Sequence, residues 1–303
     1  MNAVTINHLK KSFGSKSILN DVSFSVPQGS IFGFVGENGA GKTTTMKIIL
    51  GLLESDQGEV IVNGQQVRYG RSLTNRFIGY LPDVPAFYPY MTARQYLQLT
   101  AAISGMAHTQ IDRRISSVLN TVQLKDDLTK IRGYSRGMKQ RLGMAVAMLN
   151  QPQILICDEP TSALDPLGRK AFLDILASLR GQTTVIFSSH ILSDIERVCD
   201  RVAILHNGHI QVSGKISTLT QTHSNKTFQI DFVNSTDVNK FLVQTGLSKT
   251  TYKQDQLTLT IYEQPGQPLG ELLLADLSKS RIVPKQFQQF EPSLEDVFLE
   301  AIK

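Results

Sequence analysis

GENGAGKT, residues 36–43, matches the pattern GxxxxGK[ST] and is the most informative part of the sequence. Its glycines let the backbone turn with the N–H groups aimed inward, Lys42 can reach outer phosphates, and the Thr43 hydroxyl can bind Mg²⁺. An apolar run precedes it and a helix-like one, TTTMKIILGLL, follows, so a helix N-terminus adds positive charge to the anion site. These features predict a nucleotide phosphate site rather than a chance glycine-rich turn, with these residues as ligands: Gly36, Glu37, Asn38, Gly39, Ala40, Gly41, Lys42, Thr43 and Thr44.

Apolar runs around this motif predict a mainly parallel sheet. SIFGFV (30–35), QILIC (153–157) and TTVIFSS (183–189) are typical of strands buried on both faces, and helix-like stretches follow them. Strand, helix and strand repeated in this way are typical of an α/β domain whose helices cover the sheet. VSFSV (22–26) alternates apolar and polar residues instead, which predicts a strand half exposed to water.

The region of about 84–150 is mostly helical in pattern and lies between two of these strands. Apolar residues at spacings of four, three and four indicate one helical face: Met138, Leu142, Ala145 and Leu149. We therefore expect a helical subdomain inserted into the sheet domain. After it, the two arms of RVAILHNGHIQVSG surround Asn207-Gly208, a strong signal for a hairpin, with His206 and His209 expected at the surface.

The chain length favours two domains, because domains usually have about 100–200 residues and this chain has 303. Residues 217–226 are polar and rich in Ser and Thr, which indicates a linker. Residues 227–303 predict a small α+β accessory domain near the size of a ferredoxin-like fold. Two strands are indicated by apolar residues at alternate positions: Phe228, Ile230 and Phe232 in the first, and Leu257, Leu259 and Ile261 in the second. Helix-like stretches cover 236–246 and 269–279. A last helix begins with Ser293 and Asp296, which are spaced as in a capping box.

The composition is that of a globular protein, with 41% hydrophobic residues and a mean hydropathy of -0.10. No apolar run approaches the ~18 residues of a spanning helix, and MNAVTINHLKK lacks the apolar core of a signal peptide. The net charge of +5 favours anionic partners such as nucleotide or a lipid surface, but without a concentrated basic run nucleic acid is not expected. Cys157 and Cys199 fit buried reduced thiols better than a disulfide framework.

A second chemical signal is ILICDEP (154–160), an apolar run that leads into two acids. Asp158, at the end of a buried strand, can hold the Mg²⁺ shell, and Glu159 can orient or deprotonate a water for attack on the terminal phosphate. Downstream of a phosphate-binding loop, this pair makes ATP hydrolysis the leading interpretation.

Together with YSRGMKQR (134–141), SALD (162–165) and SSH (188–190), these motifs resemble the nucleotide-binding subunit of an ATP-binding-cassette (ABC) transporter across essentially all of residues 1–215. The resemblance implies a P-loop NTPase of the ABC type over residues 1–216, with a mainly parallel sheet, an antiparallel β subdomain and the inserted helical subdomain. The tail QFEPSLEDVFLEAI resembles that of drug and antibiotic exporters of the bacitracin and daunorubicin kind.

The resemblance also implies roles for further residues. The signature loop, usually LSGGQ, is YSRGM here, and it would close on the ATP of a second chain in a head-to-tail dimer through Ser135, Arg136, Gly137 and Met138. An ordinary helix cap at Ser135 is the alternative. His190 resembles the switch histidine at the γ-phosphate, although a lone histidine at a strand end is more often structural. Asp165 would lie at the dimer interface, and Phe13 would stack on adenine, unless it is a core residue of an early hairpin.

By the same resemblance, the cofactors are ATP and Mg²⁺, and the partners are integral-membrane permease subunits and a second ATPase chain, either identical or homologous. The chain would lie peripherally on the cytoplasmic face of the cell membrane and power export. Two alternatives are a soluble cassette ATPase acting on ribosomes or DNA, which usually has two cassettes or a long coiled coil, and a regulatory module that does not hydrolyse ATP. The accessory domain could regulate, dimerise or brace the ATPase.

IGYLPDVPAFYPYMT (78–92) departs from the family pattern. The family usually has a metal-contacting glutamine where this chain has Asp83, which could accept from a metal-bound water or pair with a basic group of a partner. Phe87, Tyr88 and Tyr90 follow. They could fill the core of the helical subdomain, or they could form an exposed docking surface for a membrane subunit, which the neighbouring Asp83 favours.

Overall fold

The computed structural model describes residues 1–71, 73–162, 164–222, 227–248, 251–262, 269–290 and 293–301. The chain forms two compact units, Met1–Ile216 with Ala301–Lys303, and Ser217–Glu300. Within the described residues, no helix is long and apolar enough to cross a membrane.

A six-stranded sheet runs through the first unit in the order β10-β9-β3-β8-β7-β6. Its strands are β3 (Ile31–Gly36), β6 (Ile78–Leu81), β7 (Ile154–Cys157), β8 (Thr184–Ser189), β9 (Arg201–His206) and β10 (His209–Lys215). All neighbours pair in parallel except β9 and β10. Every residue of β3, β7 and β8 is buried, which confirms the prediction from their continuous apolar runs.

The β9–β10 hairpin turns at Asn207 and Gly208, whose φ angles of 49° and 76° are both left-handed, as the Asn-Gly pair predicts. His209 is exposed as expected, whereas His206 is only half-exposed.

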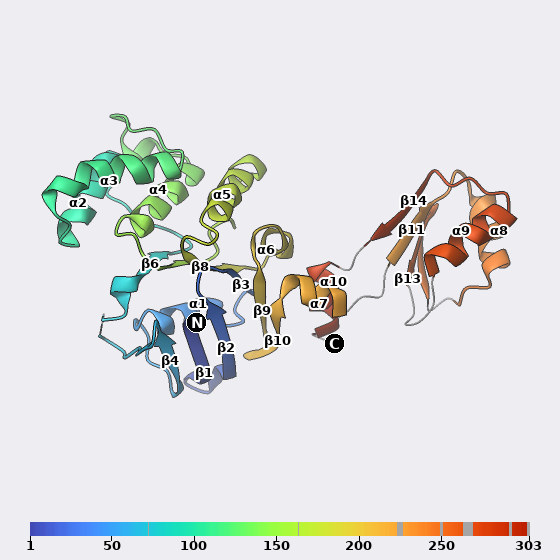
Figure 1. Ribbon diagram of the computed structural model, residues 1–303, viewed down its shortest axis with the longest axis horizontal. Helices are drawn as coiled ribbons and strands as arrows, with labels where there is room; N and C mark the ends of the chain where they lie inside the picture. Colours follow the sequence, from blue (N-terminus) through green and yellow to red (C-terminus); the bar gives the residue numbers. More distant parts are fainter. Residues whose placement is uncertain are drawn as a thin grey trace. The chain divides into compact units, whose positions relative to one another are not determined.

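A second, antiparallel sheet has the order β2-β1-β4-β5. Its strands are β1 (Asn2–Phe13), β2 (Lys16–Pro27), β4 (Gln57–Val62) and β5 (Gln65–Gln66). In β2, Val22, Phe24 and Val26 are buried and alternate with more exposed residues, as predicted. Helix α1 (Lys42–Ile49) lies between the two sheets (Figure 1). One apolar core joins side chains from both sheets and from this helix.

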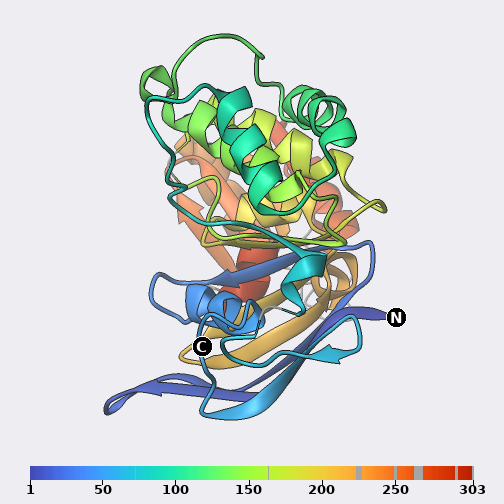
Figure 2. The same ribbon diagram turned by 90° about the vertical axis from the view of Figure 1, so that its left-hand side faces the viewer.

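The opposite face of the six-stranded sheet is covered by helices (Figure 2). They are α4 (Arg136–Met148), α5 (Pro166–Ser178) and α6 (Leu192–Val198), while α2 (Ala93–Ile103) and α3 (His108–Thr121) pack on α4. Short 3-10 helices occur at Asn75–Phe77 and Ile131–Gly133. Three of the four residues of the predicted face, Leu142, Ala145 and Leu149, are fully buried. The fourth, Met138, is half-exposed because it lies in the first turn of α4. Helix α2 begins with a capping box between Thr92 and Gln95, which the sequence analysis did not identify.

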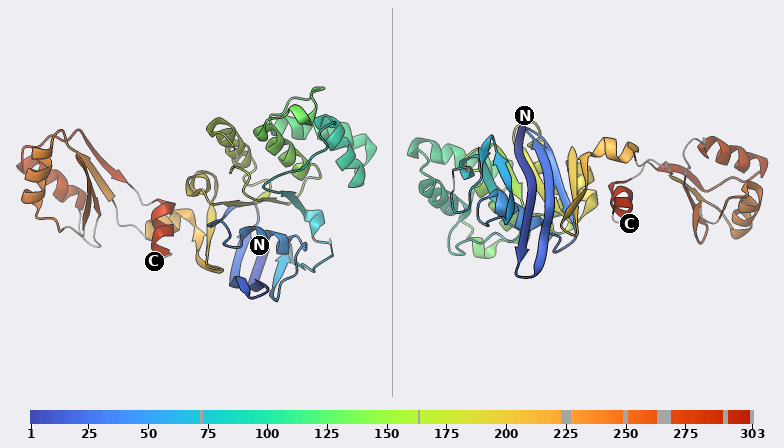
Figure 3. Two further views of the ribbon diagram at one scale, coloured as in Figure 1. Left: turned by 180° about the vertical axis from the view of Figure 1, so that it is seen from behind. Right: turned by 90° about the horizontal axis from the view of Figure 1, so that it is seen from below.

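The second unit contains a four-stranded antiparallel sheet in the order β12-β13-β11-β14, with two helices on one face (Figure 3). The elements follow the order β11 (Thr227–Asp231), α8 (Ser235–Thr245), β12 (Tyr252–Asp255), β13 (Thr258–Tyr262), α9 (Leu269–Lys279) and β14 (Gln286–Phe290). This βαββαβ arrangement is the ferredoxin-like one. Its core contains Phe228, Ile230 and Phe232 together with Leu259 and Ile261, whereas Leu257 precedes the strand and is exposed, contrary to the expected alternation.

The expected linker at 217–226 begins at the boundary between the two units, and most of it is helical, because helix α7 spans Ile216–Thr222. Residues 223–226 lie outside the described residues. The last helix, α10 (Leu294–Ala301), does begin with the expected capping pair. The Ser293 backbone N–H donates to Asp296 Oδ2 (2.9 Å), and the Asp296 N–H donates to Ser293 Oγ (3.2 Å).

Close packing of α4 on β6 yields a first prediction. A Cβ added at Gly79 would lie 2.0 Å from the Ala147 carbonyl oxygen, which is helix backbone. We expect Gly79→Ala to lower the free energy of unfolding by about 1–3 kcal/mol, because the strand or the helix must shift. Denaturant unfolding measures this change. Gly133→Ala is the matched control, since its Cβ would have its nearest neighbour at 3.9 Å; equal stability of the two variants would contradict the packing argument.

Candidate functional site

The phosphate-binding loop connects β3 to α1, as the sequence predicts. Gly39 and Gly41 have φ angles of 84° and 113°, a left-handed region that favours glycine. A Cβ at Gly41 would also lie 2.6 Å from the side chain of Leu19. The loop therefore depends on these two glycines, and it presents the start of α1 at the edge where the parallel strands end.

Lys42, Glu159 and His190 come together at this edge. Lys42 is almost fully buried, and its Nζ lies 3.0 Å from Glu159 Oε1 while donating to the carbonyls of Gly36 (2.6 Å) and Glu37 (3.0 Å). The other carboxylate oxygen, Glu159 Oε2, lies 2.8 Å from His190 Nδ1. Three residues from separate motifs thus form one connected group, and the histidine contacts the acid expected to activate water.

Asp158 is held from the neighbouring strand. Its side chain is buried, and Oδ1 accepts a hydrogen bond from the Ser188 hydroxyl at 2.8 Å. The Ser188 oxygen in turn accepts from the backbone N–H of Glu159 at 2.9 Å. Ser188 therefore fixes both acids, a role that the sequence analysis missed although the serine lies in the quoted SSH motif.

Glu159 has an uncommon backbone conformation. Its φ of 47° is left-handed, a conformation that costs a non-glycine residue on the order of 1–3 kcal/mol. Such residues cluster at functional sites, because the surrounding contacts must hold them in place. Here the Ser188 contact to the backbone and the Lys42 and His190 contacts to the side chain supply that restraint.

The donor set suits Mg²⁺. Thr43 offers an exposed hydroxyl in the first turn of α1, and Asp158 offers a carboxylate at the end of β7. Hard oxygen donors of this kind, one or two per site beside substrate phosphates, are what Mg²⁺ prefers. Asp83, the third candidate, accepts at Oδ1 from the Ser162 hydroxyl at 3.0 Å. Burial, together with the charges of Asp158 and Asp83, raises the pKa of Tyr80 to about 12.

The signature residues lie at the start of α4. Ser135 is the N-cap, and its oxygen accepts from the Met138 N–H at 3.2 Å, so the cap alternative is correct as a description of this contact. Ser135 and Arg136 are exposed, and Gly137 and Met138 are half-exposed. The described hydrogen bonds join none of them to residues 36–44. Asp165 is the exposed N-cap residue of α5 and makes no capping hydrogen bond with its side chain.

Phe13 ends the first long strand and is 51% exposed. The alternative of a core phenylalanine is therefore wrong. Lys11 Nζ lies 5.5 Å from the ring centroid, so the ring carries a cation on one side. An exposed π face remains suited to base stacking.

Phe87, Tyr88, Tyr90 and Tyr96 form what we call the aromatic surface. Tyr88 and Tyr90 are 50% and 63% exposed and stack at a centroid distance of 5.8 Å. Phe87 is half-buried with its ring 5.0 Å edge-on from Tyr96 of α2. The core explanation is thus wrong for the two tyrosines and partly right for Phe87. Tyr96 was missed because it belongs to the following helix rather than to the proline-rich stretch.

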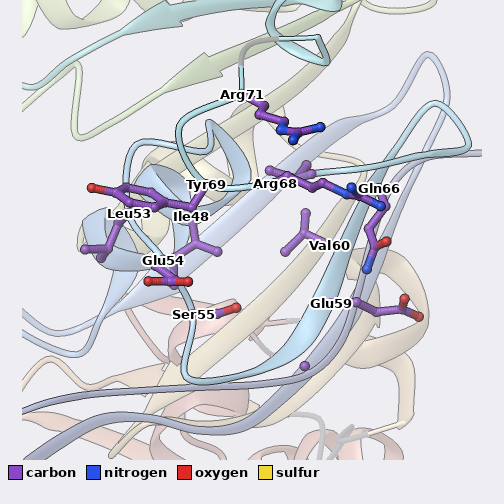
Figure 4. Close-up of a pocket in the computed structure, with 12 residues that line it drawn as sticks. Ile48, Leu53, Glu54, Ser55, Glu59, Val60, Gln66, Arg68, Tyr69 and Arg71 are labelled. Atoms are coloured by element: carbon purple, nitrogen blue, oxygen red, sulfur yellow. The ribbon is translucent and has the colours of Figure 1, made fainter.

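A pocket of about 380 Å³ lies elsewhere, beside the end of α1 and strand β4 (Figure 4). Its lining includes two basic and two acidic residues, Arg68, Arg71, Glu54 and Glu59. Apolar side chains such as Ile48 line it as well. None of the predicted site residues lines this pocket, so it is not the phosphate site.

Buried thiols complete the sequence expectations. Cys157 and Cys199 are both buried and unbridged, as predicted. Burial raises the pKa of both thiols above the usual range, which leaves them protonated and unreactive.

Comparisons with known proteins agree with this geometry. The family described as ABC transporter matches residues 19–162. An uncharacterized ABC transporter ATP-binding protein of Bacillus subtilis (strain 168), YxlF, is 37% identical over 99% of both chains. The linearmycin resistance ATP-binding protein LnrL of the same organism is 32% identical over 96% of both chains. The bacitracin transport ATP-binding protein BcrA of Bacillus licheniformis is 42% identical over 67% of this chain and 66% of its own length.

Solved structures show the same fold. An ATP-binding subunit of an ABC transporter superposes with a TM-score of 0.65 at 32% identity, covering 73% of this chain and 92% of its own. A bacterial ABC transporter cassette solved as a dimer has a TM-score of 0.63 at 23% identity, covering 70% of this chain and 98% of its own.

The Ser188 contacts yield a second prediction. We expect Ser188→Ala to lower the free energy of unfolding by about 1–3 kcal/mol, because it leaves a buried carboxylate and a backbone N–H without this partner. The same variant should hydrolyse nucleotide more slowly, since Asp158 and Glu159 lose their restraint. Thermal unfolding and phosphate release measure the two effects. Ser178→Ala, which removes only a hydroxyl bonded to a helix carbonyl, should keep normal turnover; a Ser188 variant that behaves like it would contradict the assignment.

Proposed function

The chain belongs to the ABC transporter family of ATP-binding proteins, whose general activity is ATP hydrolysis, and from this premise we propose that it dimerises on ATP and powers export through separate membrane subunits. The observation that carries the proposal is the contact of one acid, Glu159, with both Lys42 and His190 at the end of the parallel strands. This arrangement joins a phosphate-binding cation, a water-activating acid and a γ-phosphate sensor in one group.

Each residue of the group has a distinct role. Lys42 and the backbone N–H groups of residues 36–44 bind the phosphates. Glu159 orients and deprotonates the attacking water, and His190 fixes the carboxylate through its Nδ1 contact. Thr43 and Asp158 would hold Mg²⁺, which neutralises developing charge on the phosphates when bound. Phe13 supplies the stacking surface for the base.

The dimer is supported by the position of the signature residues. Ser135 and Arg136 are exposed at the N-terminus of α4, and their hydrogen bonds do not connect them to the loop 36–44 of the same chain. Donors and a helix dipole placed there can bind the γ-phosphate held by a second chain, either identical or homologous. Gly137 and Met138 belong to the same contact, and Asp165 of the α5 N-terminus would lie at that interface.

Export is supported by the names of two relatives, LnrL, which matches 96% of this chain, and BcrA, which matches 67% of it. LnrL carries linearmycin resistance in its name, and BcrA carries bacitracin transport. The proposed substrate class is therefore an antibiotic, a drug or a lipid-like molecule. The likeness to YxlF and LnrL extends through the ferredoxin-like domain, which supports its being part of the proposed exporter subunit.

The aromatic surface is the proposed docking site for the permease, which would hold the chain on the cytoplasmic face of the membrane. Tyr88 and Tyr90 present large rigid rings with polar tips, which are frequent anchors in protein interfaces. Segment 82–91 also contains Asp83, which accepts a hydrogen bond from Ser162. This bond links the segment that carries the docking surface to the loop that follows Glu159.

We expect Glu159→Gln to bind ATP and to dimerise on it, but to turn over at least ~100-fold more slowly, because the amide cannot accept the proton of the attacking water. Equilibrium ATP binding, size-exclusion chromatography with ATP, and phosphate release measure the three properties. Normal turnover by this variant would remove Glu159 from the catalytic role, and a monomer in the presence of ATP would remove the dimer.

We expect Tyr88→Ala and Tyr90→Ala to weaken assembly with the membrane subunit by about tenfold while ATP binding by the isolated chain stays unchanged, because each removes an exposed ring from the docking surface. Co-purification with a candidate permease subunit that is co-expressed with this chain measures assembly. Tyr69→Ala is the matched control, since Tyr69 is 59% exposed but lies outside the aromatic surface. Normal assembly of both variants would exclude these tyrosines from docking.

A further inference from the structure

Asp83 makes a contact that phosphate binding does not require. Its Oδ1 accepts a hydrogen bond from the Ser162 hydroxyl at 3.0 Å. Asp83 belongs to segment 82–91, which leads from β6 into the aromatic surface. Ser162 belongs to the loop from Glu159 to Asp165, which leads from β7 into α5. Between the described residues of this segment and this loop, no other hydrogen bond is found.

The same loop is fixed on its other side. Thr161 Oγ1 donates to Asp194 Oδ2 at 2.8 Å, and Arg169 Nε donates to Asp194 Oδ1 at 2.6 Å. Thr161 and Asp194 are only 2% and 3% exposed. Asp194 lies in α6, close after His190 in the chain. Thr161 is therefore anchored to α6, while the neighbouring Ser162 bonds across to Asp83, and both Ser162 and Asp83 are exposed.

A carboxylate is well suited to this contact. A hydrogen bond from a hydroxyl to an ionised acid is about twice as strong as one between neutral groups. The Ser162 backbone N–H also donates to the Glu159 carbonyl at 3.3 Å, so Ser162 closes a turn that begins at Glu159. The acid at position 83 thus has a partner within its own chain that fits its charge.

We propose that Asp83 is a positioning residue, which holds the Glu159–Asp165 loop to the membrane-facing segment through the Ser162 hydroxyl, and is not a magnesium ligand. The proposal rests on the proposed function, because it deepens the connection between docking surface and catalytic loop. The competing role is that of a metal ligand, which the glutamine usual in the family has at this position.

A double-mutant cycle in the full chain tests the proposal. Asp83→Ala and Ser162→Ala should each lower kcat for ATP hydrolysis by the same factor, about two- to fivefold, because each removes the same bond. The double variant should lose nothing further. The KM for ATP, the thermal midpoint and the Mg²⁺ concentration for half-maximal activity should stay unchanged, and Ser162→Thr should restore kcat because it keeps the hydroxyl. Ser178→Ala is the control for removal of a serine hydroxyl outside the site.

Three results would overturn the proposal. A rise in the half-maximal Mg²⁺ concentration with Asp83→Ala alone would assign the residue to the metal. Additive losses in the double variant would show that the two side chains act separately. Normal kcat in both single variants would show that the bond positions nothing. The cycle does not test the exporter proposal itself. That proposal would be rejected if the wild-type chain failed to dimerise with ATP or to assemble with a permease.

Discussion

The carboxyl ends of β3, β7 and β8 meet at one edge of a parallel sheet, and the contact of Glu159 with Lys42 and His190 depends on that constraint. Each strand is buried on both faces, so the charged or titratable residues Lys42, Glu159 and His190 come after the strands have ended. Neighbouring parallel strands end side by side, which brings three distant motifs within hydrogen-bonding distance. The buried Lys42 is compensated by Glu159 and by two carbonyl oxygens, and an uncompensated cation at that depth would destabilise the fold.

The proposed catalytic residues could be located in the sequence because each follows a run of apolar residues in a short motif. Phosphate binding and acid placement are encoded locally, in GENGAGKT and ILICDEP. Ser188 was missed for the opposite reason: its function comes from lying beside Asp158 and Glu159 in the neighbouring strand, and nothing in its own segment indicates that. The Asp83–Ser162 bond joins two exposed side chains of separate loops, and sequence spacing does not predict such a contact.

In the accessory domain, the spacing of apolar residues was enough to predict strands and helices, but amino-acid composition was not enough to predict the segment before them. The alternation in β11 and the apolar face of α9 were sufficient to expect a ferredoxin-like size, and the sheet order completes that topology. Composition was misleading at α7, since Ser and Thr favour turns but still occur in a short helix when neighbouring contacts allow it. The domain has its own apolar core, separate from the one between the two sheets of the first unit.

The left-handed backbone of Glu159 places stability and activity in opposition at one residue. Glycine and asparagine adopt that conformation at less backbone cost, but either would take the acid away from the buried Lys42 and from the proposed water activation. Stabilised versions of the chain should therefore be sought among residues remote from the strand ends. The left-handed φ angle of Glu159, visible in a structure without ligands, identifies a position where a substitution that relieves backbone strain would also remove the proposed catalytic acid.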